Sequence, residues 1–266
     1  MEDALRHLDV LRGSIRDRGS LMVTFSGGVD STFLAAVARE VLGDRAVALT
    51  ATSAALPGRE LAEARGIAES LGICHVVVQS QELADPRYNA NPRDRCFYCK
   101  SELFRIAKRV ADDMGLACVA DGTTTDDLGD FRPGRKAAEE HGVWSPLLEA
   151  GLGKEAIRRL SRGVYDLRIW NKPASPCLAS RFPYGTHITE ERLRAVERVE
   201  DAVRAAGASD VRARFHGDIV RIELRPEDRD AVIAGRDRVI ASAREAGFRF
   251  VTLDLEPLES GRLNRP

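Results

Sequence analysis

The sequence contains no run that approaches the roughly 20 consecutive apolar residues needed to cross a bilayer as a helix. Its opening residues, Met1 to His7, are acidic and follow a helical period. An export signal instead begins with a charged segment followed by an apolar one. Neither a transmembrane segment nor a secretory leader is expected, so the chain is predicted to be cytoplasmic, with no membrane partner.

Cysteine is scarce and odd in number, with five in 266 residues. This count excludes a structural disulfide framework as the basis of the fold. Each thiol is therefore expected to be reduced, buried, metal-bound or reactive. Cys74 and Cys118 lie inside apolar stretches of strand type, and we expect both to be buried core thiols.

The chain also lacks an excess of either charge. Lys and Arg number 40 and Asp and Glu number 41, which gives a formal net charge of -1. Such a balance disfavours a generic polyanion binder. Hydrophobic residues make up 44% and charged residues 30%, so the chain can form a sizeable core and is not predominantly disordered. Only five of the basic residues are lysines, which makes any single arginine weak evidence for a site.

Short apolar strands alternate with amphipathic helices through the first two thirds of the chain. This alternation predicts an α/β fold with a parallel sheet covered on both faces. In open α/β sheets the ligand binds beyond the carboxyl ends of the strands. The expected elements, in chain order, cover residues 3–17, 21–25, 32–42, 46–50, 59–71, 73–78, 100–114 and 117–120.

The pattern of predicted strands and helices changes toward the C-terminus. Residues 171–185 form an irregular, proline-rich stretch, and a long loop of this kind is more often functional than not. A small α+β module follows over residues 186–266, so the predicted organisation is a domain over 1–170, a cysteine-bearing loop and this module. Its expected elements are a helix over 190–206, a hairpin of 211–215 and 219–224, a helix over 226–246 and a strand over 248–253.

A glycine turn joins the first predicted strand to the next helix. It reads Ser26-Gly27-Gly28-Val29-Asp30-Ser31. Backbone N–H groups and the positive end of the helix point to one place in such a turn, which favours binding of a phosphate. Asp30 can hold the magnesium ion that accompanies a nucleotide phosphate. The turn is not a Walker A loop, because no Gly-Lys-Ser/Thr ending is present.

Three further cysteines suggest sulfur or metal chemistry. Cys96 and Cys99 form a Cys-x-x-Cys pair immediately before the helix expected from Lys100, where the helix dipole favours thiolate, and Cys177 lies in the proline-rich loop. The pair alone is also typical of a zinc half-site or a redox pair. Three thiolates together suit an iron–sulfur cluster with one iron left open.

The glycine turn resembles the PP-loop of the ATP pyrophosphatases, which have an adenine nucleotide alpha hydrolase-like fold. That family splits ATP into AMP and pyrophosphate and places the AMP on a substrate oxygen. The resemblance implies that Ser26, Gly27, Gly28, Asp30 and Ser31 bind ATP. The turn containing Gly122 and the acids that follow it are similar to the residues near magnesium and pyrophosphate, namely Asp126 and Asp127.

Several other segments, spread over nearly the whole chain, together resemble the LarE family of ATP-dependent sulfur transferases. The most specific is the Pro-Cys-Leu-Ala-Ser-Arg segment that ends at Arg181. The segments are Asp94 to Lys100, Asp130 to Ala138, Val143 to Leu147, Pro173 to Arg181 and Val251 to Leu255. This resemblance extends beyond the Cys-x-x-Cys pair, which by itself is weak evidence.

The LarE resemblance implies a step in the biosynthesis of the nickel-pincer nucleotide cofactor of lactate racemase-type enzymes. The carboxylates of pyridinium-3,5-biscarboxylic acid mononucleotide are adenylated, and sulfur then replaces oxygen. In one branch Cys177 would donate its sulfur and remain as dehydroalanine. In the other, Cys96, Cys99 and Cys177 would hold a 4Fe-4S cluster that supplies sulfide. Because all three cysteines are present, we favour the cluster branch, with ATP and Mg²⁺ as further cofactors.

The same resemblance implies roles for several cations. Lys100 would act beside the thiolates, Arg132 and Arg135 would lie near the nucleotide, and Arg181, Arg212 and Arg214 would bind the substrate phosphate. In so arginine-rich a chain, solubility is the competing explanation for these arginines, and for Lys100 it is solvation. Family members are similar in forming homo-oligomers around the small module, and sulfide or another sulfur donor would be the remaining partner.

Two other functions fit some of these features. A tRNA thiolase would use the same loop and cysteines, but it must also hold a polyanion. Residues 186–266 carry 15 Arg and no Lys against 16 acids, so a nucleic-acid partner is not expected. A non-catalytic nickel- or metal-binding module would use the thiolates without chemistry, and it would release no pyrophosphate.

Overall fold

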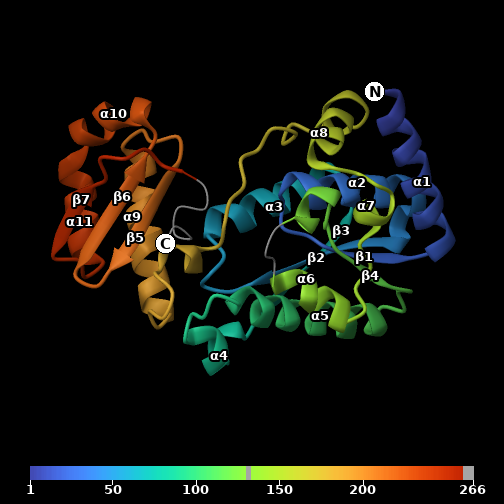
Figure 1. The fold of residues 1–266 in the computed structure, drawn as a ribbon, viewed down its shortest axis with the longest axis horizontal. Coiled ribbons are helices and arrows are strands. Elements are labelled where there is room, and N and C mark those ends of the chain that lie inside the picture. The colour runs from blue at the N-terminus through green and yellow to red at the C-terminus, as the bar shows by residue number, and fades with distance from the viewer. Residues whose placement is uncertain (130–132, 260–266) are drawn as a thin grey trace. The chain divides into compact units, whose positions relative to one another are not determined.

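The computed structural model describes residues 1–129 and 133–259. The chain forms two compact units, each built from two stretches of sequence (Figure 1). The first comprises Met1–Asp85 with Asp94–Ser175, and the second comprises Pro86–Arg93 with Pro176–Pro266. The chain therefore passes between the units three times. Unlike the division expected from sequence, the first residues of the proline-rich stretch belong to the first unit, and a short segment from within the first domain belongs to the second.

The first unit is built on a four-stranded parallel sheet in the order β3-β2-β1-β4, which confirms the predicted α/β class. The central strand is entirely buried, as expected for a parallel strand covered on both faces. The strands are β1 (Leu21–Thr24), β2 (Ala46–Thr52), β3 (Cys74–Gln79) and β4 (Val119–Ala120).

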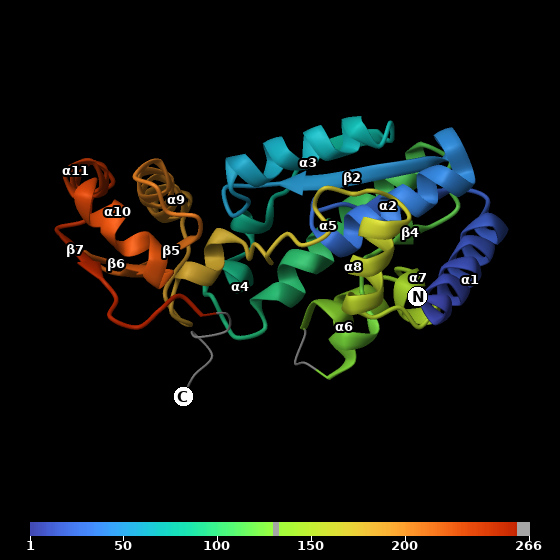
Figure 2. The same ribbon diagram turned by 90° about the horizontal axis from the view of Figure 1, so that it is seen from above.

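Helices cover both faces of this sheet (Figure 2). One face packs the main hydrophobic core against α1 (Glu2–Arg18), α2 (Val29–Leu42), α3 (Gly58–Ser70) and α8 (Lys154–Gly163). The other face packs a smaller core against α5 (Arg95–Asp113), and α5 in turn packs on α6 (Pro133–Glu140). Strands β1 and β4 are neighbours, but α2, which follows β1, and α5, which precedes β4, lie on opposite faces of the sheet. This is a topological switch point, where open α/β sheets place their ligands.

Several local features differ from the sequence expectation. Cys74 is exposed and Cys118 half-buried, so the expectation of two buried core thiols is wrong. Cys74 opens β3, which is an edge strand and is only partly covered. The helix expected from Lys100 begins earlier, at the buried Arg95, so that Cys96 and Cys99 lie inside it. Both α6 and α8 were missed because they are short and strongly polar.

The second unit contains a three-stranded sheet in the order β5-β6-β7. The predicted hairpin is present, and Gly217 at its tip has a φ of 67°, a conformation that glycine adopts without steric cost. The helix expected over 226–246 is interrupted at Gly235, a position where a Cβ would approach that of Ala206 to 2.8 Å. The elements are α9 (Glu190–Ala205), β5 (Val211–His216), β6 (Ile219–Leu224), α10 (Arg229–Ala234), α11 (Arg236–Glu245) and β7 (Phe250–Leu253).

A short segment containing α4 (Pro86–Asn89) is held in the second unit by Asn91. Asn91 is fully buried, with a φ of 54°. Its side-chain amide donates to the carbonyl of Pro183 at 2.8 Å, and its own carbonyl accepts from the amide of Gly185 at 2.9 Å. Asparagine is among the residues that tolerate this left-handed conformation. The segment is therefore an integral part of the second unit.

None of the helices among the described residues combines the length and the apolar character required to cross a membrane.

Candidate functional site

The glycine turn of residues 26–31, called the PP-loop below for its resemblance to that motif, lies directly beyond the carboxyl end of β1, at the switch point of the sheet. Gly27 has a φ of 69°, and a Cβ on it would lie 3.1 Å from the backbone of Ala64 on α3. The loop is cross-braced by its two serines, whose hydroxyls lie 3.1 Å apart, and the amide of Ser26 donates to the hydroxyl of Ser31. Glycine is required here for both conformation and space. The backbone is thus preformed to accept an anion at the start of α2.

Asp30 is in the first turn of α2 and is the least compensated acid of this region. Its carboxylate is partly buried, and among the described residues it makes no hydrogen bond or ion pair. Burial raises the pKa of Asp30, and the negative charges of Asp127 and Asp126 raise it further, while Lys154 and Arg158 oppose the shift. A cation bound beside Asp30 would relieve this cost.

The turn after β4 lies against the PP-loop. A Cβ on Gly122 would approach the backbone nitrogen of Ser31 to 3.1 Å, which places the two turns in direct proximity. The preceding Asp121 is buried and accepts from the hydroxyls of Thr123 at 2.7 Å and Ser145 at 2.8 Å. Gly122 therefore lies beside the start of α2, where a side chain would crowd the backbone of Ser31.

The two acids after this turn have structural partners. Asp126 accepts from the backbone nitrogen of Lys154 at 2.7 Å, which caps the start of α8. Asp127 is buried, forms a capping box with Thr124 and pairs with the ammonium of Lys154 at 3.2 Å. They are thus not simply solvated loop charges. Sequence reasoning missed Lys154, although its position as one of five lysines was a usable signal.

Arg158 was also missed. It lies one turn after Lys154 on α8, is exposed, and makes no hydrogen bond or ion pair among the described residues. Its charge nevertheless acts on Asp30. Two cations and three acids thus surround the positive end of α2. Carboxylates with phosphate oxygens are the ligands that Mg²⁺ prefers, so the donor set around Asp30 fits a magnesium–nucleotide complex.

A second group of charged residues that sequence reasoning missed contacts the backbone of the PP-loop. Lys172 pairs with the carboxylates of Glu60 and Glu63 on α3, each at 2.9 Å. Its ammonium also donates to the carbonyl of Gly27 at 3.4 Å. Glu60 is buried and accepts from the hydroxyl of Ser175 at 2.8 Å. The chain that leads to Cys177 is therefore attached to the loop.

Cys96 and Cys99 both lie within the first turns of α5 rather than before it. Their spacing of three residues places them on one side of the helix, near its positive end. Cys96 is exposed and Cys99 is half-buried. Cys96 lies two residues after Asp94, where the chain enters the first unit from the second. The pair is accessible to a ligand or a reactant.

The cations predicted beside these cysteines differ in their surroundings. Lys100 is exposed and lies against α6, where a Cβ on Gly134 would approach its Cγ to 2.9 Å. Arg135 donates to Glu139 on the surface of α6 at 3.2 Å. Arg132 lies outside the described residues. Lys100 is thus next to the cysteine pair in sequence and available to an anion.

Cys177 belongs to the second unit, and Arg181 holds it in place. The Arg181 guanidinium donates to the carbonyls of Pro176 at 3.0 Å and Cys177 at 3.3 Å. It also pairs with Glu200 at 2.7 Å, and its side chain is completely inaccessible to solvent. The sequence predicted that Arg181 binds substrate. In the structure its donors are used within the protein, so Arg181 orders the loop.

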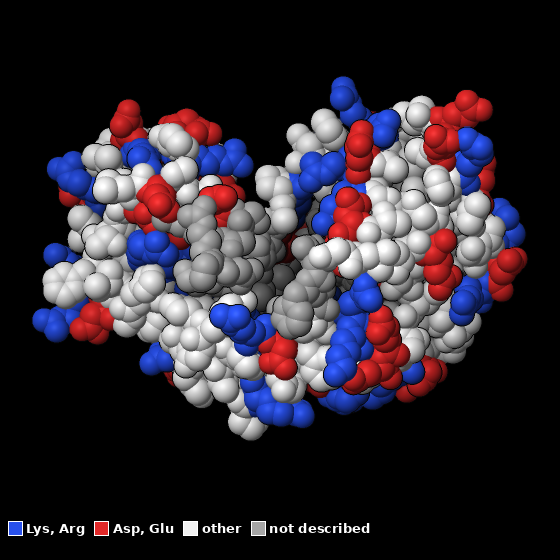
Figure 3. All heavy atoms as spheres, in the orientation of Figure 1, with Lys and Arg blue, Asp and Glu red and all other residues white. Residues whose placement is uncertain are grey.

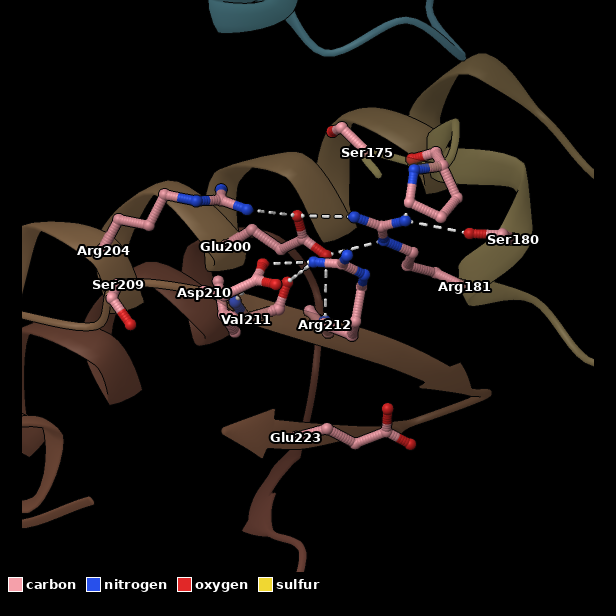
Figure 4. A network of polar contacts seen from close by, with 12 residues as sticks. Ser175, Ser180, Arg181, Glu200, Arg204, Ser209, Asp210, Val211, Arg212 and Glu223 are labelled. Carbon is pink, nitrogen blue, oxygen red and sulfur yellow. Dashed lines mark hydrogen bonds and ion pairs between the residues drawn. The ribbon is translucent and has the colours of Figure 1, made fainter. Parts of the chain in front are cut away.

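Arg212 of β5 lies in the same buried network as Arg181 and Glu200 (Figure 4). Arg214 is buried two residues further along β5. Arg212 pairs with Asp210, and burial together with the charge of Arg181 lowers its pKa. Arg214 donates two hydrogen bonds to Glu223, at 2.9 and 2.7 Å, and one to the carbonyl of Ser180 at 2.8 Å. These arginines are engaged with carboxylates that an anionic ligand would have to replace.

Glu200 is the centre of this network. It pairs with Arg181 and Arg204 and accepts from the backbone nitrogen of Ala213 at 3.1 Å. Burial alone would raise the pKa of Glu200, but the two guanidinium groups hold it below its usual range. Within the parts of the chain that the structure describes, no three His, Cys, Asp or Glu side chains are grouped so as to hold a metal ion on their own.

Comparisons with known proteins gave one matching family model and several relatives. A family model described as asparagine synthase matches residues 9–128, which contain the PP-loop. A pyridinium-3,5-bisthiocarboxylic acid mononucleotide synthase of Lactiplantibacillus plantarum is 39% identical over 96% of this chain and 92% of its own length. An uncharacterized protein of Synechocystis is 44% identical over 97% of both chains. A probable tRNA sulfurtransferase of Methanobrevibacter smithii is 26% identical over 71% of this chain and 50% of its own.

Proposed function

Because the chain belongs to the LarE family of PP-loop enzymes and is an ATP-dependent sulfur-transferring enzyme, we propose that its substrate is pyridinium-3,5-biscarboxylic acid mononucleotide. The enzyme adenylates a carboxylate of this substrate and replaces oxygen by sulfur, in nickel-pincer nucleotide biosynthesis for lactate racemase-type enzymes. The similarity to the Lactiplantibacillus synthase over nearly the whole chain supports this proposal more than any single residue does.

Adenylation takes place at the PP-loop. The loop amides hold the phosphates of ATP, and the substrate carboxylate attacks the α-phosphorus, so that an acyl–AMP anhydride forms and pyrophosphate leaves. Asp30 would hold Mg²⁺, which neutralises charge on the phosphates. Lys154 and Arg158 lie on the same side of the loop as Asp30, and we assign them to the departing pyrophosphate. The guanidinium of Arg158, which is exposed and makes no hydrogen bond or ion pair among the described residues, supports this role.

Sulfur would come from a 4Fe-4S cluster on Cys96, Cys99 and Cys177. Three thiolates leave one iron of such a cluster without a protein ligand, and the cluster would supply sulfide. The accessibility of Cys96 and Cys99 at the positive end of α5 fits this role. Lys100, exposed beside them, would attract the anionic substrate. Arg135 and the undescribed Arg132 remain assigned to the nucleotide on the basis of the family pattern.

Sacrificial donation by Cys177 is the alternative route. Its thiolate would displace AMP from the acyl group to give a thioester, and elimination would then release the thiocarboxylate and leave dehydroalanine. The order imposed on Cys177 by Arg181 serves either route. Arg212 and Arg214 remain assigned to the substrate phosphate, which would take the place of Asp210 and Glu223 as their partner. A homo-oligomer around the second unit is proposed on the family pattern alone.

A tRNA substrate is less well supported. The similarity to the probable tRNA sulfurtransferase covers half of that protein. On the face shown in Figure 3, Lys and Arg are interspersed with Asp and Glu over both units, rather than gathered in one basic area. A polyanion would favour the gathered arrangement. We therefore retain the mononucleotide as the substrate.

The first test is pyrophosphate release by the anaerobically purified protein with ATP, Mg²⁺ and the biscarboxylate mononucleotide. Release that depends on the mononucleotide is expected. No release would contradict the proposed function, and release with tRNA instead would favour a thiolase. A non-catalytic metal-binding module would release none with either substrate.

The second test concerns the sulfur source. Iron and acid-labile sulfide should be present in the anaerobic protein and should be lost in Cys96→Ala, whereas Cys74→Ala, which alters another exposed thiol, should retain both. Each of Cys96→Ala, Cys99→Ala and Cys177→Ala should abolish sulfur transfer while pyrophosphate release survives. If Cys96→Ala still transfers sulfur and Cys177 loses the mass of hydrogen sulfide after one turnover, the sacrificial route is correct.

A further inference from the structure

Lys172 connects α3, the PP-loop and the chain that leads to Cys177. We call Lys172 and its partners Glu60 and Glu63, together with Ser175, the junction. The side chain of Lys172 is only 14% exposed, and its three donors meet the carboxylates of Glu60 and Glu63 and the carbonyl of Gly27. It is thus the one lysine among the described residues whose ammonium contacts the PP-loop backbone and α3 together. None of these contacts is used in the adenylation chemistry.

Glu60 is the fixed end of this junction. Its side chain is 7% exposed. Although burial alone would raise the pKa of Glu60, hydrogen bonds from Lys172 and Ser175 lower it, so the carboxylate is ionised at neutral pH. Its two oxygens are divided between the partners, with Oε2 on Lys172 at 2.9 Å and Oε1 on Ser175 at 2.8 Å. A buried charge with divided contacts holds both partners in one geometry.

The base of the junction is close to the ATP-binding loop. Ala64 lies one turn after Glu60 on α3 and leaves no room for a side chain on Gly27. Helix α3, the PP-loop and residues 172–175 are therefore packed as one body within the first unit. Any displacement of the loop is transmitted to these residues by direct contact.

The chain itself connects this junction to the sulfur-bearing residue. Two peptide units separate Ser175 from Cys177, so their Cα atoms lie within about 7 Å of each other whatever the conformation between them. Fixing Ser175 therefore limits the positions that Cys177 can reach. Without this attachment, Cys177 would be held by the hydrogen bonds from Arg181 to the carbonyls of Pro176 and Cys177.

We propose that Glu60 and Lys172 are positioning residues that fix the Cys177-bearing segment to the ATP-binding loop. As a result, sulfur rather than water attacks the acyl carbon of the acyl-adenylate. This inference rests on the proposed function. If the segment is released, water attacks the acyl carbon instead, and the products are the original carboxylate and AMP. ATP is then consumed without formation of a thiocarboxylate.

The test is the ratio of pyrophosphate released to thiocarboxylate formed in Glu60→Gln, Lys172→Met and Ser175→Ala. In the first two variants this ratio should rise by roughly tenfold, because small misplacements of reacting groups cost this much or more. Ser175→Ala removes one hydrogen bond and should raise the ratio by about fivefold or less. Lys172→Arg keeps the cation and should recover much of the coupling.

Matched controls are Glu69→Gln on the exposed side of α3 and Lys108→Met, an exposed lysine on α5. Both should leave the ratio unchanged. Partial unfolding lowers the two products together and does not move the ratio. A proportional loss of both products in Glu60→Gln and Lys172→Met would therefore overturn the inference.

A second measurement is independent of the proposed function. Alkylation of Cys177 by iodoacetamide, in protein stripped of iron with a chelator and without substrate, should become several-fold faster in Lys172→Met, because the segment is less confined. The exposed Cys74 serves as the internal reference. An unchanged rate at Cys177 would contradict the positioning role even if the wild-type enzyme transfers sulfur. Absence of pyrophosphate release in the wild type would contradict only the proposed function.

Discussion

The charges around the PP-loop and those on β5 of the second unit are arranged in opposite ways. Near the loop, the pKa of Asp30 is raised, and among the described residues neither its carboxylate nor the exposed guanidinium of Arg158 makes a hydrogen bond or ion pair. On β5, Arg212 and Arg214 are buried against carboxylates, and Glu200 has a lowered pKa because two guanidinium groups surround it. The first region leaves its charges available to a ligand, whereas the second uses them on each other.

This contrast separates two uses of charge. An uncompensated buried acid costs stability and is retained for what it binds. A compensated buried cluster orders the chain around it, because removing any member leaves a charge without a partner. Substitutions near the loop should therefore change ligand binding and catalysis, and substitution of Glu200, the centre of the β5 network, should change stability. The following experiments test that separation, from the largest expected effect to the smallest.

Glu200→Ala should destabilise the second unit by about 3–5 kcal/mol, because the completely buried Arg181 would lose its carboxylate partner, whereas the partly exposed Arg204 keeps Asp201. Hydrogen exchange of β5 and β6 in the full chain measures this change. Tryptophan fluorescence is not suited to it, because both tryptophans of the protein precede residue 171 and lie outside this network. Asp201→Ala, at the exposed neighbouring position of α9, should change stability by less than about 0.5 kcal/mol. Equal exchange in the two variants would show that the buried network does not determine stability.

Asp30→Asn should lower pyrophosphate release roughly 100-fold or more, because the magnesium–phosphate complex loses a charged ligand. Its thermal midpoint should rise at the same time, since a carboxylate with a raised pKa opposes folding when ionised. The measurement is the rate of release together with the midpoint in the absence of ATP. A fall in both quantities would place Asp30 in the same class as Glu200.

Arg158→Ala should raise the KM for ATP roughly tenfold, which corresponds to about 1.4 kcal/mol, with little change in folding stability. Arg159→Ala is the matched control, because the next residue of α8 is exposed but paired with Glu155 at 3.0 Å. Initial rates over a range of ATP concentrations measure the effect. If both variants behave alike, the assignment of Arg158 to pyrophosphate is wrong.

Lowering the pH should destabilise the β5 network and stabilise the region around Asp30. The pKa of Glu200 is lowered on folding, so its contribution to stability is present above the ordinary glutamate value of about 4.3 and is lost as the pH falls through the folded value. The pKa of Asp30 is raised on folding, so its ionised carboxylate destabilises the first unit. This destabilisation is removed as the pH falls through the folded value toward the ordinary aspartate value of about 3.9. Hydrogen exchange as a function of pH should show β5 losing protection before α2, and the reverse order would contradict this assignment.

Cys74→Ser should change stability by less than about 0.5 kcal/mol, because the thiol is exposed on an edge strand. Cys118→Ser should cost more, since that thiol is half-buried and burial raises its pKa. Chemical denaturation measures both. A larger effect at Cys74 would restore the expectation of a buried thiol that the structure contradicts.

The sequence predicted much of the fold because its strongest signals are local. The apolar stretch before Ser26, the glycine at Gly27 and the hairpin glycine at Gly217 each depend on a few neighbouring residues. The start of α5 and the exposure of Cys74 were predicted wrongly. These depend on what packs against a segment, and a strand at the edge of a sheet has the same local sequence pattern as one at its centre.

The candidate site was predictable only in part, for the same reason. The loop and the cysteines are visible as motifs, whereas Lys154, Arg158 and Lys172 stand alone in the sequence. Arg181 was assigned to substrate because its segment is distinctive. In the structure its burial against Glu200 gives it an internal partner instead. Which cation faces a ligand and which faces a carboxylate is a question of distance between remote segments.

The sequence by itself determined the α/β class, the PP-loop and the presence of three cysteines suited to sulfur chemistry, because each is encoded in contiguous residues. The tertiary structure alone decided which charges are compensated. Lys172 reaches Glu60 across 112 residues of chain, and Arg214 reaches Glu223 across a hairpin. Electrostatic energy depends on separation in space and on burial, and neither quantity can be read from the order of residues.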